Sequence, residues 1–255
     1  MRQPAAETRV GNSYGRQSSW NLDGRGMNSA APRISIVVPM LNEAPELPAT
    51  LAALRVGLDA GCELILVDGG SSDGSVAIAG AAGFSPIIGP RGRARQMNAG
   101  AASSRAEVLL FLHADTRLPD DAVALIEHAL ASGRHRWGRF DVRIAGRPRM
   151  LRVIARLMNL RSRLTGIATG DQAIFVTRAA FAAVGGFPDQ PLMEDIELSR
   201  RLLELSRPAC LRTPVVTSGR RWEQRGLWRT MLLMWRLRWA YWRGVSAAEL
   251  ATYYR

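Results

Sequence analysis

The chain has 255 residues, of which 47% are hydrophobic and 22% charged, which suits one soluble globular domain with a full core. Its formal net charge is +12, and all of its 34 basic residues are arginine. The surplus reflects either an arginine-rich coding composition or a surface that meets anions, such as nucleotide phosphates, anionic lipid or nucleic acid. Cys62 and Cys210 stand in no metal-binding or disulfide-rich spacing, which is typical of a reducing compartment.

The first segment, residues 1–32, is rich in Gly, Ser, Asn, Gln and Arg and has no periodicity. We expect it to be a disordered extension, because it cannot bury enough apolar surface to fold alone. Its arginines are followed by no apolar run of the kind that marks a secretory signal. No uncharged apolar run in the chain reaches the ~18 residues that a membrane-spanning helix needs. We therefore expect a cytoplasmic location.

Strand and helix patterns then alternate along the chain. Short apolar runs that end in polar residues predict buried strands, while apolar residues at helical spacing and glycine or proline boundaries predict helices. In chain order, strands are expected at 34–38, 63–68, 86–88, 108–112, 137–144 and 173–177. Helices are expected at 46–60, from 75, from 93, and at 119–130, 149–164, 178–184 and 194–205. The alternation predicts a single α/β domain with a mostly parallel central sheet flanked by helices.

Polar residues recur where the predicted strands end. Asn42 and Glu43 follow the first strand, Asp68 ends the second, and His113 and Asp115 follow the fourth. Because the carboxyl ends of parallel strands meet at one edge of a sheet, we expect these side chains to converge on one cleft.

Among these strand ends, the stretch VDGGSSDGS at residues 67–75 is the one most typical of a ligand-binding loop. Asp68 can accept hydrogen bonds from a base or a ribose, and Gly69 allows the backbone to approach a ligand closely. Asp73 is either a ligand or the side chain of an Asx turn or helix N-cap.

Four motifs stand in the order seen in glycosyltransferase family 2. They are ISIVVPMLNE at 34–43, VDGGSSDGS at 67–75, FLHADT at 111–116, and VGGF at 184–187 followed by Glu194-Asp195. Each motif is weak alone, but the ordered set resembles that family over roughly residues 33–225. RGRARQMNAG at 91–100 further resembles a compact bacterial subgroup whose acceptors are mostly unassigned. The resemblance implies a GT-A (Rossmann-like) fold and transfer, with inversion, of a sugar from a UDP- or GDP-linked donor.

The resemblance also implies roles for individual residues. Asp195 is the expected base, with Glu194 as the alternative. Asp115 is expected to hold Mg²⁺ or Mn²⁺ at the donor diphosphate. His113 stands where the family's D-x-D pattern has its first aspartate, and it is either a second metal ligand or a hydrogen-bonding residue at the strand end.

Contacts to the nucleotide sugar are expected from eleven residues: Pro39, Asn42, Glu43, Asp68, Gly69, Asp73, Arg91, Arg95, Asn98, Asp115 and Asp171. For Arg91 and Arg95 the alternative is a solvated helix start, and for Asp171 it is a turn residue. The segment RRWEQRG at 220–226 loosely resembles the Q-x-x-R-W element of related synthases, in which case Trp222 would stack on the acceptor and Arg225 would hold diphosphate.

The carboxyl-terminal segment, residues 226–255, predicts an amphipathic helix. Trp228, Trp235, Trp239 and Trp242 fall on one helical face among arginines. The face is either an interfacial surface for anionic lipid or a packed face with snorkelling arginines. Together with the basic helix at 149–164, it favours a peripheral enzyme on the inner face of the cell membrane, with a lipid-linked acceptor.

Three other classes of protein compete with this interpretation. The altered HAD motif leaves open a catalytically inactive relative that binds a nucleotide sugar. The net charge of +12 suggests a nucleic-acid-binding protein, but acidic strand ends repel phosphates, so we expect no nucleic-acid partner. The third class is a sugar-nucleotide pyrophosphorylase. Enzymes of that kind resemble one another in a glycine-rich loop with arginine and lysine at the end of the first strand. This chain has PMLNE at that place and contains no lysine, which argues against this class.

Overall fold

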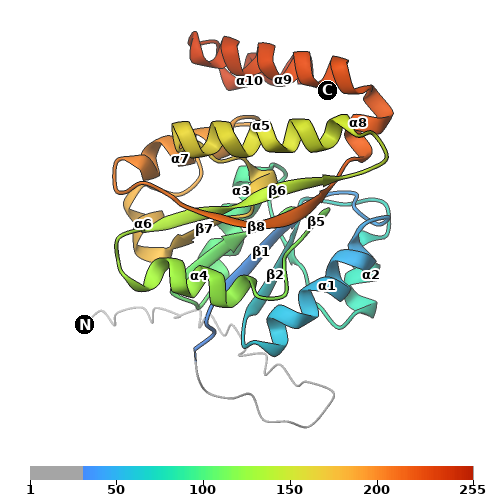
Figure 1. The fold of residues 1–255 in the computed structure, drawn as a ribbon. Helices are drawn as coiled ribbons and strands as arrows, with labels where there is room; N and C mark the ends of the chain where they lie inside the picture. The colour runs from blue at the N-terminus through green and yellow to red at the C-terminus, as the bar shows by residue number, and fades with distance from the viewer. Residues whose placement is uncertain (1–30, 255) are drawn as a thin grey trace, which may run out of the picture. The chain divides into compact units, whose positions relative to one another are not determined.

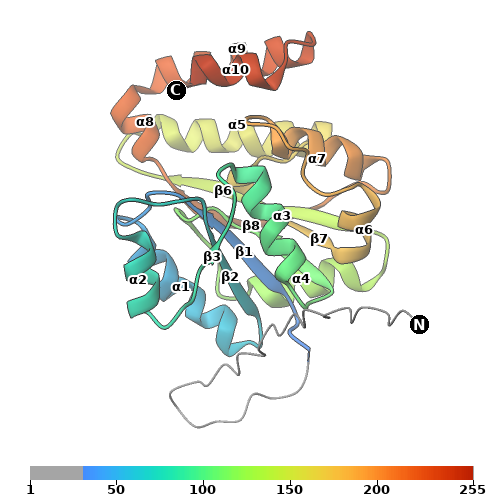
Figure 2. The ribbon, with the colours of Figure 1, turned by 180° about the vertical axis from the view of Figure 1, so that it is seen from behind.

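The computed structural model describes residues 31–254. The expected disordered extension at residues 1–32 lies outside the described residues, apart from its last two positions. In the described part, one twisted sheet is covered by helices on both faces (Figures 1 and 2).

The strands of the described chain are β1 (Ser35–Met40), β2 (Glu63–Asp68), β3 (Ile87–Ile88), β4 (Val108–Phe111), β5 (Thr116–Arg117), β6 (Trp137–Ala145), β7 (Ile174–Thr177) and β8 (Ala209–Ser218). The helices are α1 (Leu47–Asp59), α2 (Ser75–Ala81), α3 (Arg93–Ser103), α4 (Ala122–Ala131), α5 (Met150–Thr165), α6 (Arg178–Ala183), α7 (Glu194–Leu203), α8 (Arg220–Arg225), α9 (Leu227–Trp242) and α10 (Ala247–Tyr254), with a short 3-10 turn, η1 (Gly170–Gln172).

The sheet has the strand order β3-β2-β1-β4-β7-β6-β8-β5. Strands β1 to β4 pair in parallel, β6 pairs in parallel with β8, and β7 and β5 run antiparallel to their neighbours. Six of the eight strands in the described chain therefore point the same way, which confirms the mostly parallel sheet. Their carboxyl ends share one edge.

Two apolar cores lie on opposite faces of the sheet, because successive side chains of a strand point to opposite sides. In β1, Ile36 and Val38 pack with α1, α4 and α5, whereas Val37 packs with α3, α6 and α7. Figure 1 looks onto the side of α1 and α4, and Figure 2 onto the side of α3. This double burial is why the β1 sequence is apolar without alternation.

Strand β8 is absent from the expected elements, although it spans Ala209–Ser218. Its register against β6 shifts between Phe140 and Asp141, opposite Leu211 and Pro214. A bulge of this kind accommodates a proline that would otherwise interrupt a ladder. The strand is half-buried and irregular, so its sequence carries neither an alternating nor a continuous apolar pattern.

The tail, residues 226–255, forms two helices, α9 and α10, where one amphipathic helix is expected, and α8 precedes them. Gly226, with φ +85°, separates α8 from α9, and Gly244, with φ +92°, separates α9 from α10. Both glycines have a positive φ, a backbone conformation that other residues rarely adopt. None of the described helices combines the length and the apolar character that crossing a bilayer requires.

Candidate active site

A cleft of about 320 Å³ opens at the carboxyl edge of the sheet. The ends of β1, β4, β6 and β8 form its floor, the η1 turn and the start of α7 form one wall, and α8, α9 and the end of α10 form the other. Nine of the predicted site residues line it: Pro39, Glu43, His113, Asp115, Asp171, Glu194, Asp195, Trp222 and Arg225.

Asp195 lies in the first turn of α7 and borders the cleft. Its Oδ2 accepts a hydrogen bond of 2.8 Å from the Gly170 N–H, and its Oδ1 accepts one of 2.8 Å from the Ile196 N–H. Burial, followed by the charge of the adjacent Glu194, raises the pKa of Asp195 to about 6, against the effect of these hydrogen bonds and of Arg93. A carboxyl group with this pKa is half ionised at about pH 6 and mostly ionised at neutral pH, which suits general-base chemistry.

Glu194 precedes Asp195 but is held differently. Its side chain is only 5% exposed, and its Oε1 lies 3.5 Å from Arg93 Nη1. Arg93 begins α3, so this ion pair connects the two helices that flank the cleft. Glu194 is therefore engaged in an ion pair with the partly exposed Arg93, while Asp195 carries the carboxyl group with the raised pKa.

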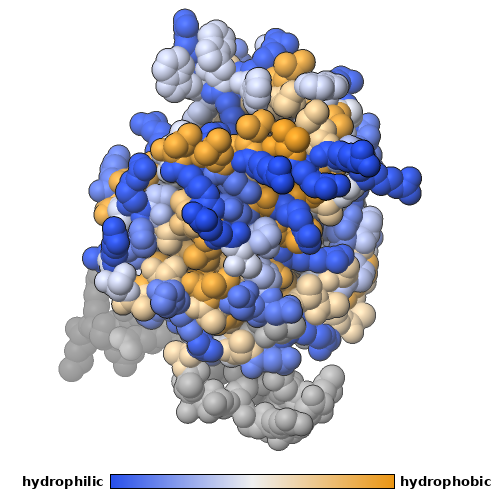
Figure 3. Space-filling model, viewed as in Figure 1, coloured by the Kyte–Doolittle hydropathy of each residue, from blue (hydrophilic) through white to orange (hydrophobic). Residues whose placement is uncertain are grey.

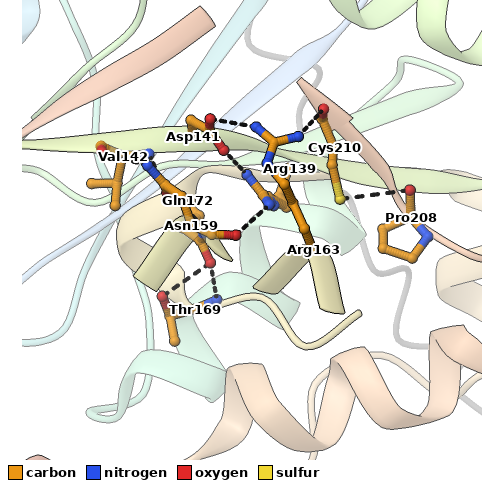
Figure 4. Close-up of polar contacts among 9 residues, drawn as sticks. All are labelled: Arg139, Asp141, Val142, Asn159, Arg163, Thr169, Gln172, Pro208 and Cys210. Carbon is orange, nitrogen blue, oxygen red and sulfur yellow. Dashed lines mark hydrogen bonds and ion pairs between the residues drawn. The ribbon is translucent and has the colours of Figure 1, made fainter. Parts of the chain in front are cut away.

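The turn that holds Asp195 is anchored to the sheet through α5, as Figure 4 shows. Asn159 of α5 bonds both the N–H (2.9 Å) and the carbonyl (3.0 Å) of Val142 in β6. Gln172 donates to Asn159 Oδ1 at 3.3 Å and accepts from the Thr169 N–H at 3.2 Å. Gly170, which follows Thr169 in the chain, donates its N–H to the Asp195 carboxylate. Side-chain amides thus fix the turn that presents the donor N–H.

A buried ionic cluster fixes α5 next to this turn (Figure 4). Arg139 of β6 is fully buried, and its guanidinium pairs with Asp141 and donates to the Asn159 carbonyl at 3.2 Å. Arg163 of α5 pairs with the other oxygen of Asp141 and donates to the Cys210 carbonyl at 3.3 Å. One carboxylate between two arginines leaves the cluster with a net positive charge beside an otherwise apolar core.

His113 packs against the same turn from the other side. Its Nδ1 lies 3.3 Å from Asp171 Oδ1, and a Cβ atom built on Gly170 would overlap its Nε2. Burial works to raise the pKa of Asp171, but the hydrogen bond and charge of His113, with Arg93, outweigh it and hold that pKa below its ordinary value. The contact favours the strand-end hydrogen-bonding alternative for His113.

Glu43 and Asp115 both line the cleft, where the strands β1 and β4 end. Burial and the charge of Asp115 raise the pKa of Glu43, and Arg220 opposes them. Arg220 Nη2 lies 3.5 Å from Glu43 Oε2, and its Nη1 lies 3.5 Å from Glu46 Oε1. Glu43 and Asp115 thus bring two carboxylates to a cleft whose lining also carries Arg93, Arg220 and Arg221.

The carboxylates of the cleft suit a divalent cation that takes most of its ligands from substrate phosphates and waters. No group of three or more His, Cys, Asp or Glu side chains among residues 31–254 is arranged around a common point. Mg²⁺ is usually bound through one or two carboxylates together with substrate phosphates and waters. Asp115, with Glu43 also in the cleft lining, matches that pattern, whereas the Nδ1 atom of His113 is paired with Asp171 and its Nε2 atom lies against Gly170.

Seven predicted residues lie outside the cleft lining, and most of them make hydrogen bonds that shape loops. Asp68 accepts from the N–H groups of Gly70 (2.9 Å) and Ser71 (3.0 Å), and Asp73 accepts from the Ala44 N–H (3.0 Å). Asn42 Oδ1 accepts from the Ser72 N–H at 2.8 Å. These bonds join the loops after β1 and β2, next to the cleft, since Met40 pairs with Asp68 in the sheet.

The remaining four are distributed around α3. Arg95 forms a two-pronged ion pair with Asp189, with N···O distances of 2.7 and 2.9 Å. Asn98 exchanges two hydrogen bonds with the backbone of Phe187. Both therefore tie α3 to the loop before α7. Arg91 is exposed at the start of the same segment, and Gly69 faces Gln96, which leaves no room for a side chain at 69.

The cleft also contains residues that the sequence patterns miss. Arg220, Arg221, Arg238 and Tyr254 line its tail side, and Arg93 lines its α3 side. The ring of Tyr254 lies under the Arg221 guanidinium at 5.2 Å, and its hydroxyl accepts from the same arginine. Burial lowers the pKa of Arg221. The double arginine before Trp222 was a usable signal, but nothing in the sequence indicates that α10 returns to the cleft.

A doubly wound α/β sheet with acidic strand ends and an arginine-lined opposite wall defines a GT-A-type domain. The family model "Glycosyl transferase family 2" matches residues 35–183, which is more than half of the chain, and the chain belongs to this family. The resemblance drawn from the four motifs is thereby confirmed.

Individual relatives match parts of the chain. A PGL/p-HBAD biosynthesis glycosyltransferase of Mycobacterium tuberculosis is 38% identical over 115 residues, covering 42% of this chain and 44% of that protein. An undecaprenyl-phosphate 4-deoxy-4-formamido-L-arabinose transferase of Yersinia pestis is 31% identical over 159 residues, covering 57% and 48%. The aligned regions thus span about half the length of these relatives.

Solved structures share the fold at low identity. The mannosyltransferase PcManGT from Pyrobaculum calidifontis, in complex with GDP-Man and Mn²⁺, superimposes with a TM-score of 0.62 at 21% identity, over 83% of this chain and 62% of that one. S. aureus TarS 1–349, in complex with UDP, gives 0.59 at 15% identity, over 73% and 60%. Both support the GT-A fold.

Proposed function

We propose that this protein transfers a sugar from a UDP- or GDP-linked donor to an acceptor hydroxyl, with inversion. The observation that carries the proposal is the position of Asp195, a carboxyl group with a pKa near 6 that faces a cleft whose floor carries Asp115 and Glu43. Membership of the family and the nucleotide complexes of structural neighbours support the donor class.

In this proposal, Asp195 removes the proton of the acceptor hydroxyl as that oxygen attacks the anomeric carbon from the face opposite the diphosphate. The Gly170 N–H holds the carboxylate in place. Asp115, with Glu43 beside it, would hold Mg²⁺ or Mn²⁺, and such an ion when bound neutralises charge on the departing diphosphate. Arg221 and Arg225 supply positive charge from the opposite wall.

The loops after β1 and β2 form the nucleoside side of the proposed site. Asp68 and Asn42 are already in loop-shaping hydrogen bonds, so base recognition there would use their remaining lone pairs and the backbone. Trp222 offers an indole to an acceptor at the tail side. A lipid-linked acceptor is supported by the undecaprenyl-phosphate named for the Yersinia relative and by the exposed aromatic tail; it would place the enzyme on the inner face of the membrane.

The test separates binding from turnover. Calorimetry with UDP and GDP, with and without Mn²⁺, identifies the preferred nucleobase and the metal requirement. We expect Asp115→Asn to reduce the gain in nucleotide affinity that Mn²⁺ produces. Turnover is then followed as nucleoside diphosphate release from a panel of nucleotide sugars with a bacterial lipid extract.

We expect Asp195→Asn to keep nucleotide affinity within about twofold and to lose turnover by a factor on the order of 10²–10⁴, the usual contribution of a general base. Glu204→Gln is the matched control, because it removes one exposed carboxylate just past the end of α7. Near-normal turnover by Asp195→Asn would refute the assignment of the base. Nucleotide binding without turnover by the unmodified protein, over the whole panel, would favour the inactive relative.

A further inference from the structure

Helix α9 is apolar on two opposite faces. Its inner face packs Leu237, with Leu233 and Met234, against Leu192 and Met193 of the loop before α7. A surface helix ordinarily buries one apolar stripe and turns charged residues outward. The inner stripe already satisfies that requirement, so the outer face needs its own explanation.

The outer face carries a stripe of large aromatic side chains. Trp228, Trp235, Trp239 and Trp242, together with Leu232, follow helical spacing and are between 54% and 79% exposed. Their Cβ positions fall on one side of the helix, because three- and four-residue steps return to the same face. A row of five large, exposed apolar side chains along one helix face marks an interaction site.

Arginines run beside the tryptophan stripe. Arg229, Arg236 and Arg243 are exposed and repeat every seven residues, which places them in a row along one flank of the tryptophans. The Arg243 guanidinium lies 5.2 Å from the centre of the Trp239 ring. Tryptophan and arginine side by side on one face are typical of helices that lie in the plane of a bilayer surface.

Helix α5 repeats the pattern at the same end of the described unit (Figures 1 and 2). Val153, Leu157, Leu160 and Leu164 form a stripe that is between 45% and 70% exposed, and Figure 3 shows hydrophobic side chains gathered along this helix with hydrophilic ones around them. Exposed arginines accompany this stripe as well, at positions 149, 152 and 156.

We propose that the outer face of α9, assisted by the α5 stripe, docks this protein on an anionic lipid bilayer. Charge selects this occupant. A second copy of the chain would bring its own arginine rows against these rows, and both carry the same sign. Anionic headgroups complement them, and the tryptophan rings suit the boundary between headgroups and acyl chains.

Docking would place the cleft close to the bilayer. The same helix that presents the tryptophans outward contributes Met234 and Arg238 to the cleft wall. One helix diameter, roughly 10 Å, therefore separates the lipid-facing side from the proposed site. The use of this arrangement for a membrane-anchored acceptor rests on the proposed transferase function, whereas the docking itself does not.

The experiment measures binding of the full chain to sedimented vesicles, without donor. We expect binding to vesicles of phosphatidylcholine and phosphatidylglycerol (7:3) and much weaker binding to phosphatidylcholine alone. Tryptophan fluorescence should shift to the blue on binding and be quenched by lipids brominated near the headgroup. Absence of binding to the anionic vesicles would overturn the proposal whatever the variants do.

Two variants locate the contact. Arg229→Gln/Arg236→Gln/Arg243→Gln should weaken binding on the order of a hundredfold, because each basic residue near an anionic surface contributes a factor of roughly five. The matched control is a triple exchange of the exposed arginines at 134, 136 and 207 to glutamine, which removes the same charge from the loops before β6 and β8. Equal losses in the two triple variants would show that net charge alone drives binding and would overturn the docking face.

The apolar part is tested by Trp235→Ala/Trp239→Ala, which should lower binding at least tenfold. The control is Ile88→Ala/Leu205→Ala, which trims two exposed apolar side chains elsewhere. Circular dichroism and nucleotide affinity establish that both pairs are folded. Unchanged vesicle binding by the tryptophan variant would overturn the proposal, as would a dimer in sedimentation velocity that this variant abolishes. For the unmodified protein, turnover without vesicle binding would contradict the docking alone, and vesicle binding without turnover would contradict the proposed function alone.

Discussion

The half-buried carboxyl group of Asp195, the proposed base, gives a prediction that needs no substrate. Asp195 has a pKa of about 6 in the folded chain against an ordinary value of 3.8. A carboxyl group whose pKa is higher in the folded than in the unfolded chain stabilises the fold while it is protonated. That contribution is complete below pH 3.8 and is lost as the pH rises through about 6. The ionised carboxylate of Asp195 is therefore a destabilising feature at neutral pH.

Asp195→Asn keeps the side chain neutral at every pH. The rise from 3.8 to about 6 corresponds to about 3 kcal/mol, at about 1.4 kcal/mol per unit, and this is a ceiling because the side chain borders the cleft. We expect the variant to exceed the unmodified protein in free energy of unfolding by about 1–3 kcal/mol at pH 8, and by about half as much at pH 5.

Urea unfolding between pH 5 and pH 8, with unchanged m-values, measures this difference. The amide also replaces one acceptor oxygen, which adds an offset that does not depend on pH, so the growth of the difference with pH is diagnostic. Glu204→Gln should show no such growth, since that exposed carboxylate has no buried environment. Parallel stability curves for Asp195→Asn and the unmodified protein would refute the buried, raised-pKa description of the base.

Two further substitutions test the surroundings of the base. Glu194→Gln removes the like charge beside Asp195, so the acidic limb of the pH–turnover profile should move to lower pH; complete loss of turnover would instead make Glu194 the base. Gly170→Ala places a Cβ against the His113 imidazole and should lower the free energy of unfolding by about 1–3 kcal/mol, measured by urea unfolding. Gly80→Ala, whose Cβ would meet nothing within 4 Å, should leave stability unchanged or slightly raised, and equal losses in the two variants would contradict the packing argument.

The strands that support the site could be predicted because each carries an uninterrupted apolar run. Val37 and Val67 are fully buried on the α3 face of the sheet, and their neighbours Ile36 and Leu66 are buried on the opposite face, so that burial of the strands on both faces leaves a direct signature in the sequence. Strand β8 leaves none, since a bulge and Pro214 break its pattern. The cleft edge made by β1 and β4 was therefore predictable, while the contribution of Thr217 and Ser218 was not.

Side-chain roles were harder to predict than strand ends. Asp73 and Asn98 have the residue types of ligands, and the structure finds both in hydrogen bonds that fix loops. An aspartate that shapes a turn and an aspartate that binds a ribose look alike in a sequence. In the tail, the spacing of the tryptophans in the sequence indicated the outer stripe. The position of Tyr254 in the cleft lining was not indicated, because it depends on the turn at Gly244.

The backbone conformation at the cleft connects the tail with the base. Asn42, Ala173 and Met193 are the non-glycine residues with positive φ within 31–254, at 57°, 48° and 64°. All three lie in segments that enter the cleft, and such conformations persist only where surrounding packing holds them.

For Met193, which precedes α7, that packing comes from Leu237 of α9 and Leu250 of α10. The tail helices therefore hold the residue that sets where α7 begins and, two positions later, where Asp195 points. Because α9 also presents the tryptophan face, a force that the bilayer exerts on this helix would act on the same packing that positions the base. If both proposals hold, membrane docking and catalysis would be coupled through one small apolar cluster, Leu192, Met193, Leu237 and Leu250.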